Sequence, residues 1–343
     1  MFFLTNSSQL INLNLHKPKL LYIGDRQYVH HTRFIEALSL DFCIKTAFIQ
    51  EEPIEEDSGF SPEIVICSPL LEPLIYAVKN YQVPIIGICW AQELNEPRSV
   101  LKQNSDFSKI LSPLAGIIVD NNHTESILRN TMNYQGAIAR ITFYLEPFRN
   151  STLIKKGKNE PPTFISARRF EPLYRNDLIL EGLRIIGREF DLHLIAVGGG
   201  TQLEEMKNRH ENEIKSGLFE FTGKLTSNQT LNLIQDSDFY ISASRSDGIS
   251  VTLLEAMSLG KVCLVSDFPS NLEIIEDGLN GFVFENENLD SLISKCKLAI
   301  GLENSARLQI SKNAIDTVSQ RFDWKQSRRT LIQFLQSFTS KYS

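Results

Sequence analysis

The sequence has few cysteines, no long hydrophobic run and no excess of positive charge, and each of these absences excludes a class of protein. It contains five cysteines, an odd number, with no Cys-x-x-Cys pair. Zinc or a disulfide framework is therefore not expected, and we predict free thiols in a reducing cytosol, four of the five buried. No stretch approaches the roughly 20 apolar residues of a membrane-spanning helix. Lysine and arginine number 35 against 41 acids, and this formal charge of -6 gives no global attraction to nucleic acid.

What is present is a repeated alternation of short apolar strands and helices. The chain has 343 residues, 42% of them hydrophobic, which suits about two domains with sizeable cores. Short apolar runs bounded by Gly or Pro are typical of buried parallel strands. They lie at 19–23, 42–49, 63–67, 84–89 and 115–119, and again at 163–167, 192–197, 219–222, 239–243 and 262–265. We therefore predict an α/β protein with two Rossmann-like domains whose parallel sheets face each other across a cleft.

A polar segment at 150–162, which ends in two prolines, is the predicted linker between the two domains. The expected units are one Rossmann-like domain at 1–155, a second at 156–320 and a C-terminal helix at 321–343. Residues 323–338 are amphipathic, and two interpretations stay open. The helix either packs on one or both domains, crossing back to the first, or lies at a membrane surface. Its basic residues, which favour the second interpretation, are Arg321, Lys325, Arg328 and Arg329.

The segment 239–260 predicts a phosphate site. Its strand ends in a loop with Gly248, where backbone can approach a ligand closely, and a helix of good formers follows. Ser250 is the predicted N-cap, and Thr252 lies in the first turn. Free N–H groups at the start of such a helix, on Ser250, Val251 and Thr252, favour negative charge.

Two acids eight residues apart accompany this helix. Asp247 lies in the loop, and Glu255 lies on the helix between apolar neighbours. A carboxylate in such surroundings needs a partner, and the two hydroxyls of a ribose would provide one. A side chain of Glu255 that faces solvent or pairs with a nearby base is the alternative.

A composite motif over about 40 residues resembles the donor-binding region of the retaining GT-B glycosyltransferases, the large glycogen-synthase-like group (glycosyltransferase family 4 type). That family has two acids separated by seven residues, then Glu-Ala-Met, a Gly, an apolar strand and a later Glu-x-Ile-x-Asp-Gly-x-x-Gly. The matching positions are Asp247, Glu255-Ala256-Met257, Gly260, 262–265, and Glu273, Ile275, Asp277, Gly278 and Gly281.

The resemblance extends toward the start of the second domain. Lys224 and Leu225 match the loop that cradles the nucleotide base. Arg168 matches the arginine that contacts the diphosphate, while the family's following lysine falls on Tyr174 in one alignment and on Arg175 in another. The loop therefore looks like that of a subfamily with Glu-Pro-x-Tyr. Residues 151–175 hold six Lys or Arg against two acids, and this local excess suits a diphosphate.

The first half matches the family less closely. Gly24 resembles the glycine loop after the first strand, which faces the donor phosphates. Trp90 and Glu93 follow a strand where the family often has His or Trp and then an acid, which implies contact with the acceptor or with the donor sugar. An ordinary tryptophan at a strand end is the alternative for Trp90.

The resemblance implies transfer of a sugar from a nucleotide-diphosphate sugar to a glycan or lipid-linked hydroxyl acceptor, with retention at the anomeric carbon. It implies that the domain at 1–155 binds the acceptor and the domain at 156–320 binds the nucleotide sugar. Arg168 and Arg175 would neutralise the diphosphate, Asp247 would hold donor-sugar hydroxyls and Glu255 the ribose. No metal, no further cofactor and no nucleic acid is expected. Family context indicates bacterial surface glycan or glycolipid assembly by a cytoplasmic protein, with peripheral contact at the inner membrane face as an option. A nucleotide-sugar epimerase of the same fold and a non-catalytic GT-B partner subunit are the alternatives.

Overall fold

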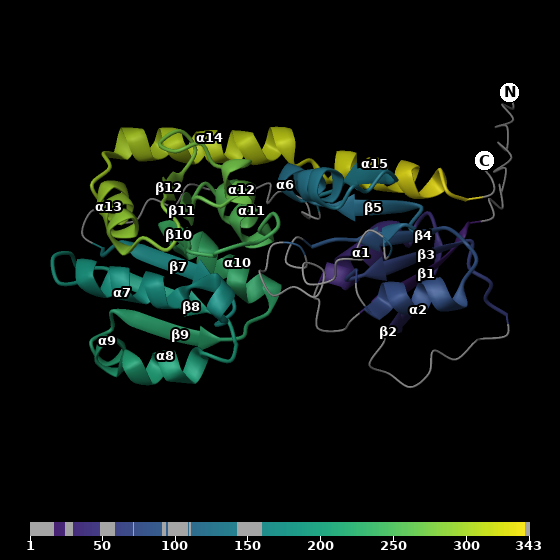
Figure 1. Ribbon diagram of the computed structural model, residues 1–343. Helices are drawn as coiled ribbons and strands as arrows, with labels where there is room; N and C mark the ends of the chain where they lie inside the picture. Colours follow the sequence, from purple (N-terminus) through teal and green to yellow (C-terminus); the bar gives the residue numbers. More distant parts are fainter. Residues whose placement is uncertain are drawn as a thin grey trace, which may run out of the picture.

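Two α/β domains lie side by side in the structure (Figure 1). The computed structural model describes residues 17–24, 30–48, 59–70, 72–90, 94, 109, 111–142 and 160–339. Each domain is built on one six-stranded sheet, and the neighbouring strands are parallel. The predicted α/β class with two parallel sheets is confirmed. The predicted linker falls largely outside the described residues.

The sheet of the N-terminal domain has the strand order β2-β1-β3-β4-β5-β6. Its strands are β1 (Lys19–Gly24), β2 (Cys43–Phe48), β3 (Ile64–Ser68), β4 (Ile85–Ile88), β5 (Gly116–Val119) and β6 (Ala137–Arg140). The helices along this stretch are α1 (His30–Leu38), α2 (Glu72–Asn80), the short α6 (Asn122–Ser126) and the π-helical η1 (Ile127–Thr131). The sequence pattern does not predict β6, because this edge strand is short and largely unburied and so lacks a continuous apolar run.

The sheet of the C-terminal domain has the order β12-β11-β10-β7-β8-β9. Its strands are β7 (Thr163–Ala167), β8 (His193–Val197), β9 (Phe219–Gly223), β10 (Phe239–Ser242), β11 (Val262–Ser266) and β12 (Phe282–Phe284). Its helices are η2 (Pro172–Tyr174, 3₁₀), α7 (Asn176–Ile186), α8 (Leu203–Arg209), α9 (Glu211–Lys215), α10 (Ser227–Asp236), α11 (Val251–Ser258), α12 (Pro269–Leu272), α13 (Leu289–Ile300) and α14 (Asn304–Arg321). α8 and α9 are divided at His210, whose buried ring packs edge-on against Phe219.

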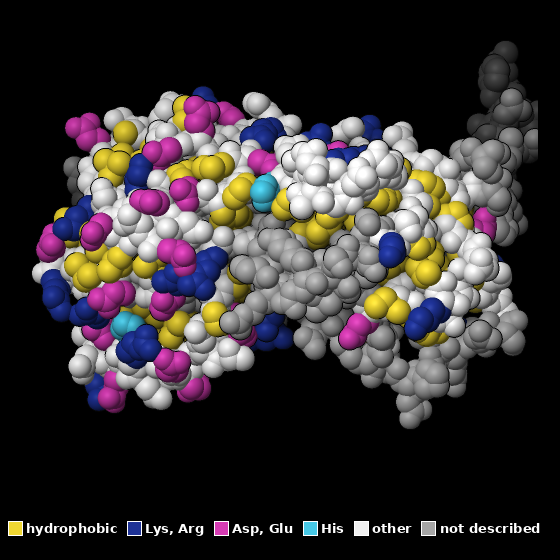
Figure 2. All heavy atoms as spheres, in the orientation of Figure 1, with side chains coloured by type: hydrophobic (Ala, Val, Ile, Leu, Met, Phe, Trp, Pro, Cys, Tyr) yellow, Lys and Arg dark blue, Asp and Glu magenta, His cyan; other side chains and the backbone are white. Residues whose placement is uncertain are grey.

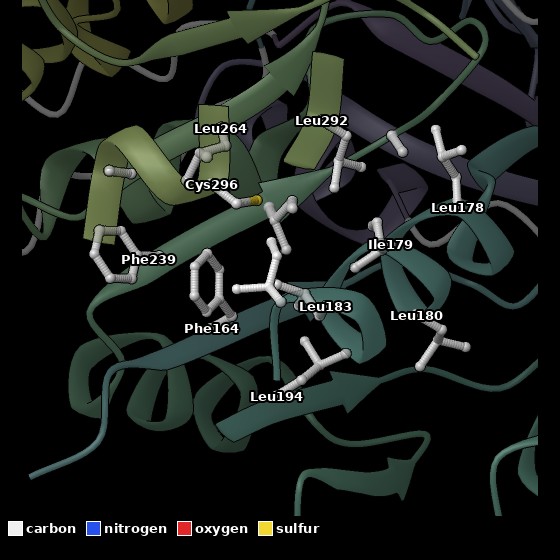
Figure 3. Close-up of a cluster of buried hydrophobic side chains, with 14 of the residues drawn as sticks. Phe164, Leu178, Ile179, Leu180, Leu183, Leu194, Phe239, Leu264, Leu292 and Cys296 are labelled. Carbon is white, nitrogen blue, oxygen red and sulfur yellow. The ribbon is translucent and has the colours of Figure 1, made fainter. Parts of the chain in front are cut away.

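Helices cover both faces of this sheet, which is why its strands read as continuous apolar runs. Successive residues of β7 point to opposite faces. Phe164 packs with residues of α7 and α13, and its ring stacks on that of Phe239 at 4.7 Å between centroids (Figure 3). Ile165 packs instead with residues of α10, α11 and α14. The prediction that most cysteines are buried is confirmed, since Cys43 alone of the five is exposed.

The helix α15 (Trp324–Gln336) leaves the C-terminal domain and packs on the N-terminal one (Figure 1). Leu331 and Leu335 are fully buried there, in one apolar cluster with residues of β1 and α1. Arg328 donates to the backbone oxygen of Ala37 at 2.8 Å and also pairs with Asp41. The apolar face of α15 is therefore used inside the protein, as the packing interpretation requires.

The described helices do not include one whose length and apolar character would let it cross a lipid bilayer.

The two domains also meet through Glu273, which directly follows α12 in the C-terminal domain. Its carboxylate accepts hydrogen bonds from the Asn122 backbone N–H at 3.0 Å, from the Asn122 side chain at 2.8 Å and from the His123 N–H at 2.9 Å. All three donors lie at the start of α6, next to the carboxyl end of β5. This contact holds the second domain against the strand end that carries Asp120.

Replacing Leu335 with Ala should destabilise the protein by about 2–5 kcal/mol, because a fully buried leucine leaves a cavity between α15 and the N-terminal sheet. The matched control is Gln333→Ala on the exposed side of the same helix, which should change the free energy of unfolding by less than about 0.5 kcal/mol. Urea denaturation followed by circular dichroism measures both. Equal midpoints for the two variants would contradict the packing role of α15.

Candidate functional site

The C-terminal sheet places its chemistry where the strand order reverses. The first strand of this domain, β7, lies between β8 and β10, so the connections leave the sheet in opposite directions from its carboxyl end. Ligands of open α/β sheets bind at such a point. Arg168 directly follows β7, and Asp247 lies in the loop between β10 and α11. The structure brings these two side chains into an ion pair.

Arg168 is a buried cation with partners on three sides. Its guanidinium pairs with Asp247, donates to Ser250 Oγ at 2.8 Å and lies over the Tyr174 ring, 4.4 Å from the centroid. Its side chain is only 10% exposed. Burial lowers the pKa of Arg168, but the charge of Asp247 and its hydrogen bond, together with Tyr174 and Tyr240, more than offset this and hold that pKa above its ordinary value. Its Nε has no hydrogen-bond partner within the part of the chain that the structure describes.

A chain of hydroxyl groups fixes the start of α11 beside this arginine. Ser250 is the N-cap, as the sequence predicts, and its Oγ accepts from the Leu253 N–H. The same oxygen lies 3.1 Å from Thr252 Oγ1, which in turn lies 2.9 Å from the hydroxyl of buried Tyr240 on β10. The amino end of this eight-residue helix therefore faces Arg168, and both carry positive potential.

Two glycines let the loop after β8 press against the Arg168 segment. Gly198 has φ +143, and a Cβ there would lie 2.3 Å from the backbone oxygen of Arg168. Gly200 has φ +151, and a Cβ there would lie 2.4 Å from the backbone oxygen of Phe170. Any larger residue would push the arginine out of place.

The Glu-Pro-x-Tyr loop forms η2 and is tied to the same turn. Glu171 accepts from the Thr201 N–H at 3.1 Å and from its hydroxyl at 2.6 Å, and these bonds hold the pKa of Glu171 below its usual range. Tyr174, at the end of η2, supplies the ring beneath Arg168. The first residue of this loop thus anchors it, and the last lies at the site.

The structure does not bring Arg175 to the Arg168–Asp247 pair. Arg175 has φ 48, and its guanidinium is held by Asp177 at 3.0 Å and by Glu287 at 2.7 Å. Glu287 also pairs with Arg245. Of the two residues aligned with the family's lysine, Tyr174 is therefore the one in contact with Arg168.

The other predicted donor-side residues of this domain lie around the same strand ends. Lys224 is exposed beside Gly199, and Leu225 is half-buried against the apolar cluster of α10 and α11. Glu255 is half-buried on α11, and Val251 is its first residue. Their contacts with a nucleotide stay predictions.

The predicted site residues of the N-terminal domain are Gly24, Trp90 and Glu93. Gly24 ends β1 and is buried. Trp90 is only 9% exposed, packs in the cluster that includes α15, and its indole N–H donates to Ser68 Oγ at 2.7 Å. That hydrogen bond suits the alternative of an ordinary buried tryptophan at a strand end. Glu93 lies outside the described residues.

Asp120, which the sequence analysis missed, reaches this loop from the other domain. It directly follows β5, and its Oδ2 accepts from the Ile249 N–H at 2.8 Å. Burial raises the pKa of Asp120 to about 7, the hydrogen bond from Ile249 opposes this shift, and the charge of Asp247 adds to it. The available signal was an acid directly after the apolar strand predicted at 115–119.

The described residues offer neither a cluster of metal ligands nor, on the face shown, a continuous basic surface. Within the described ranges, no three His, Cys, Asp or Glu side chains come together in a way that could hold a metal ion. Lys and Arg side chains are intermixed with Asp and Glu over the visible face of the C-terminal domain (Figure 2). This face therefore does not resemble the continuous basic surfaces that bind nucleic acid.

Two such domains with parallel sheets define the GT-B fold, and the chain has it. The solved structure of sucrose-phosphate synthase from Thermosynechococcus elongatus superposes with a TM-score of 0.76 at 11% identity, covering 94% of this chain and 99% of that one. Residues 149–317 match the family described as "Glycosyl transferases group 1". This match covers just under half of the chain and contains Arg168, Asp247 and Glu255.

Two curated relatives are similar over shorter stretches. An uncharacterized glycosyltransferase from Methanocaldococcus jannaschii is 32% identical over 135 residues, which is 39% of this chain and 34% of the relative. The UDP-Gal:alpha-D-GlcNAc-diphosphoundecaprenol alpha-1,3-galactosyltransferase of Escherichia coli is 26% identical over 106 residues, 30% of this chain and 27% of the relative. The matches span less than two thirds of the length of these curated relatives.

Replacing Gly198 with Ala should destabilise the protein by about 1–3 kcal/mol, because the new Cβ meets the Arg168 carbonyl and the backbone there has a positive φ. The matched control is Gly199→Ala one residue along, where the nearest atom is Lys224 Cβ at 3.8 Å. That variant should be neutral or slightly stabilised. Thermal unfolding distinguishes the two, and equal losses would contradict the close approach of the turn to Arg168.

Proposed function

We propose that this protein is a retaining, metal-independent glycosyltransferase of the glycogen-synthase-like type that uses a nucleotide-diphosphate sugar as donor. The observation that carries the proposal is the buried Arg168 guanidinium at the amino end of α11, with an Nε that no described residue engages. A buried cation next to a helix amino end is suited to a diphosphate, which supplies several acceptor oxygens and negative charge.

The reaction must stabilise a departing nucleoside diphosphate while positive charge develops at the anomeric carbon. Arg168 and the first N–H groups of α11 would take up the diphosphate charge, which is the term expected to dominate. Asp247, whose Oδ1 accepts from the Gly248 N–H at 2.9 Å, would orient donor-sugar hydroxyls. Glu255 would hold the ribose, and Lys224 and Leu225 would border the base.

The bond changes follow from retention. The bond between the anomeric carbon and the diphosphate oxygen breaks, and the acceptor oxygen bonds to the same face of the sugar. The acceptor proton passes to the departing diphosphate, so the products are the glycosylated acceptor and the nucleoside diphosphate. With the charge carried by Arg168 and a helix terminus, this scheme needs no metal ion.

The acceptor we propose is a glycan or a lipid-linked hydroxyl. The name of the Escherichia coli relative gives a UDP-linked sugar and a diphosphoundecaprenol-linked acceptor for that protein. We extend this pairing of substrates to the present chain and place its work in the cytoplasm, at or near a membrane face. Since the apolar face of α15 is buried against the N-terminal sheet, contact with a membrane would have to use another surface.

Arg168→Lys should lower kcat for sugar transfer by at least about 100-fold, because a lysine keeps one charge but loses the geometry that holds several oxygens. The matched control is Arg169→Ala, since that neighbouring side chain is 67% exposed and should leave the rate within about twofold. Release of nucleoside diphosphate from UDP-, GDP- and ADP-linked sugars measures the rate. A wild-type rate in the lysine variant would refute the phosphate role.

Glu255→Gln should weaken binding of a nucleoside diphosphate by about tenfold, because a charged acceptor for ribose hydroxyls becomes a neutral one. Calorimetry with UDP and 2′-deoxy-UDP tests this directly if uridine is the base. Wild-type protein should prefer the ribose form, and the variant should lose that preference. The exposed Glu276→Gln is the control. An unchanged preference in the Glu255 variant would remove the ribose assignment.

A further inference from the structure

Asp120 is a buried carboxylate of the N-terminal domain that lies against the loop of the C-terminal domain. Its Oδ2 accepts from the Ile249 N–H at 2.8 Å, and its Oδ1 accepts from the Asn121 side chain at 2.5 Å. The residue is only 8% exposed. A carboxylate withdrawn from water to this extent destabilises the fold unless its oxygens are well bonded.

Gly248 makes this approach feasible. A Cβ at position 248 would lie 2.1 Å from Asp120 Oδ2, so the carboxylate occupies the space that any side chain there would fill. The glycine expected to admit a ligand thus admits a side chain of the opposite domain. The loop is contacted from both sides, by Arg168 through Asp247 and by Asp120.

Two carboxylates therefore converge on one short loop. The charge of Asp247 acts on Asp120 and disfavours its ionisation, although Asp247 itself is paired with Arg168. Two acids brought together from separate domains are unfavourable for stability alone. Such an arrangement is characteristic of sites that bind a ligand or carry out chemistry.

The position of this acid pair relative to the proposed diphosphate site indicates what it would bind. The Arg168 side chain contacts both Asp247 and Ser250, the N-cap of α11. The two carboxylates of Asp120 and Asp247 therefore lie near the amino end of α11. If a diphosphate binds at that helix end, the sugar covalently linked to it lies close to the two carboxylates. Its hydroxyls are neutral donors, which a carboxylate accepts well.

We propose that Asp120 is a positioning and specificity-determining residue, which accepts a hydrogen bond from a hydroxyl of the transferred sugar in place of the Ile249 N–H. This inference rests on the proposed function. The sugar would then be held between a carboxylate of each domain, Asp247 on one side and Asp120 on the other. A donor lacking that hydroxyl would gain no hydrogen bond to Asp120 and would bind more weakly than a donor that has it.

The experiment compares binding of a nucleotide sugar with binding of the nucleoside diphosphate alone. Calorimetry is run on the full chain with UDP-glucose, UDP-galactose, UDP-N-acetylglucosamine, GDP-mannose and ADP-glucose, and with UDP, GDP and ADP. The nucleotide sugar that wild-type protein binds and its matching nucleoside diphosphate are then tested on Asp120→Asn and Asp120→Ala. For each variant, the dissociation constant of the nucleotide sugar is divided by that of the nucleoside diphosphate. The Asn variant keeps the shape and one oxygen for the Ile249 N–H.

The matched control is Glu273→Gln. Glu273 also joins the domains by accepting backbone N–H donors, and its carboxylate bonds to Asn122 and His123 at the start of α6, whereas Asp120 bonds to Ile249. If Asp120 only held the domains together, its variants would behave like the Glu273 variant and change the two affinities in parallel.

We expect the Asp120 variants to weaken nucleotide-sugar binding by about 10- to 100-fold relative to the nucleoside diphosphate, the range for losing a hydrogen bond to a charged group. An unchanged ratio in both variants, with wild-type binding intact, would overturn this inference and leave the proposed function standing. Wild-type protein that bound none of these nucleotides would instead overturn the proposed function, and the inference with it.

Discussion

The ion pair between Arg168 and Asp247 is the interaction on which the arrangement of the C-terminal domain depends. A guanidinium withdrawn from water needs charged and polar partners, and those of Arg168 come from two separate parts of the chain. Asp247 and Ser250 lie in the segment between β10 and α11, and Tyr174 ends η2. The strand order that sets β7 beside β10 makes these contacts feasible, since it brings two strand ends distant in sequence to one edge of the sheet.

The neighbouring loops hold Arg168 and Asp247 in position. The glycine turn after β8 lies against the backbone of Arg168 and Phe170, and Glu171 ties η2 to Thr201 in the same turn. The hydroxyl chain from Ser250 through Thr252 to Tyr240 fixes the helix end. The pair is thus held by rigid elements on three sides, which is the condition for electrostatic stabilisation without reorganisation during a reaction.

Much of the C-terminal domain could be predicted because its signals are local. Apolar runs marked its strands, and the spacing of Asp247, Gly248 and Ser250 marked a loop that leads into a helix. The longest helix described in this domain, α14, was missed because four buried residues in eighteen leave its sequence mostly polar. Asp120 and Glu273 each make hydrogen bonds to the opposite domain. The residue pattern within a strand or helix does not indicate which part of another domain that element will contact. The hydrogen bond from the Trp90 indole N–H to Ser68 is a further contact between separate strands that the sequence does not indicate.

The crossing of α15 onto the N-terminal domain has a consequence for how the protein is made. Leu331 and Leu335 share an apolar cluster with Leu20 and Tyr22 of β1. The N-terminal sheet is synthesised first, but α15, which covers one of its faces, is synthesised after the whole C-terminal domain. Until then the apolar face of that sheet is exposed to water and to other chains, a situation that favours aggregation during synthesis. The C-terminal domain has no such delay, because its strands and the helices of its two apolar clusters lie within one continuous stretch of chain. The domain that is synthesised first is therefore expected to be the last to become fully folded.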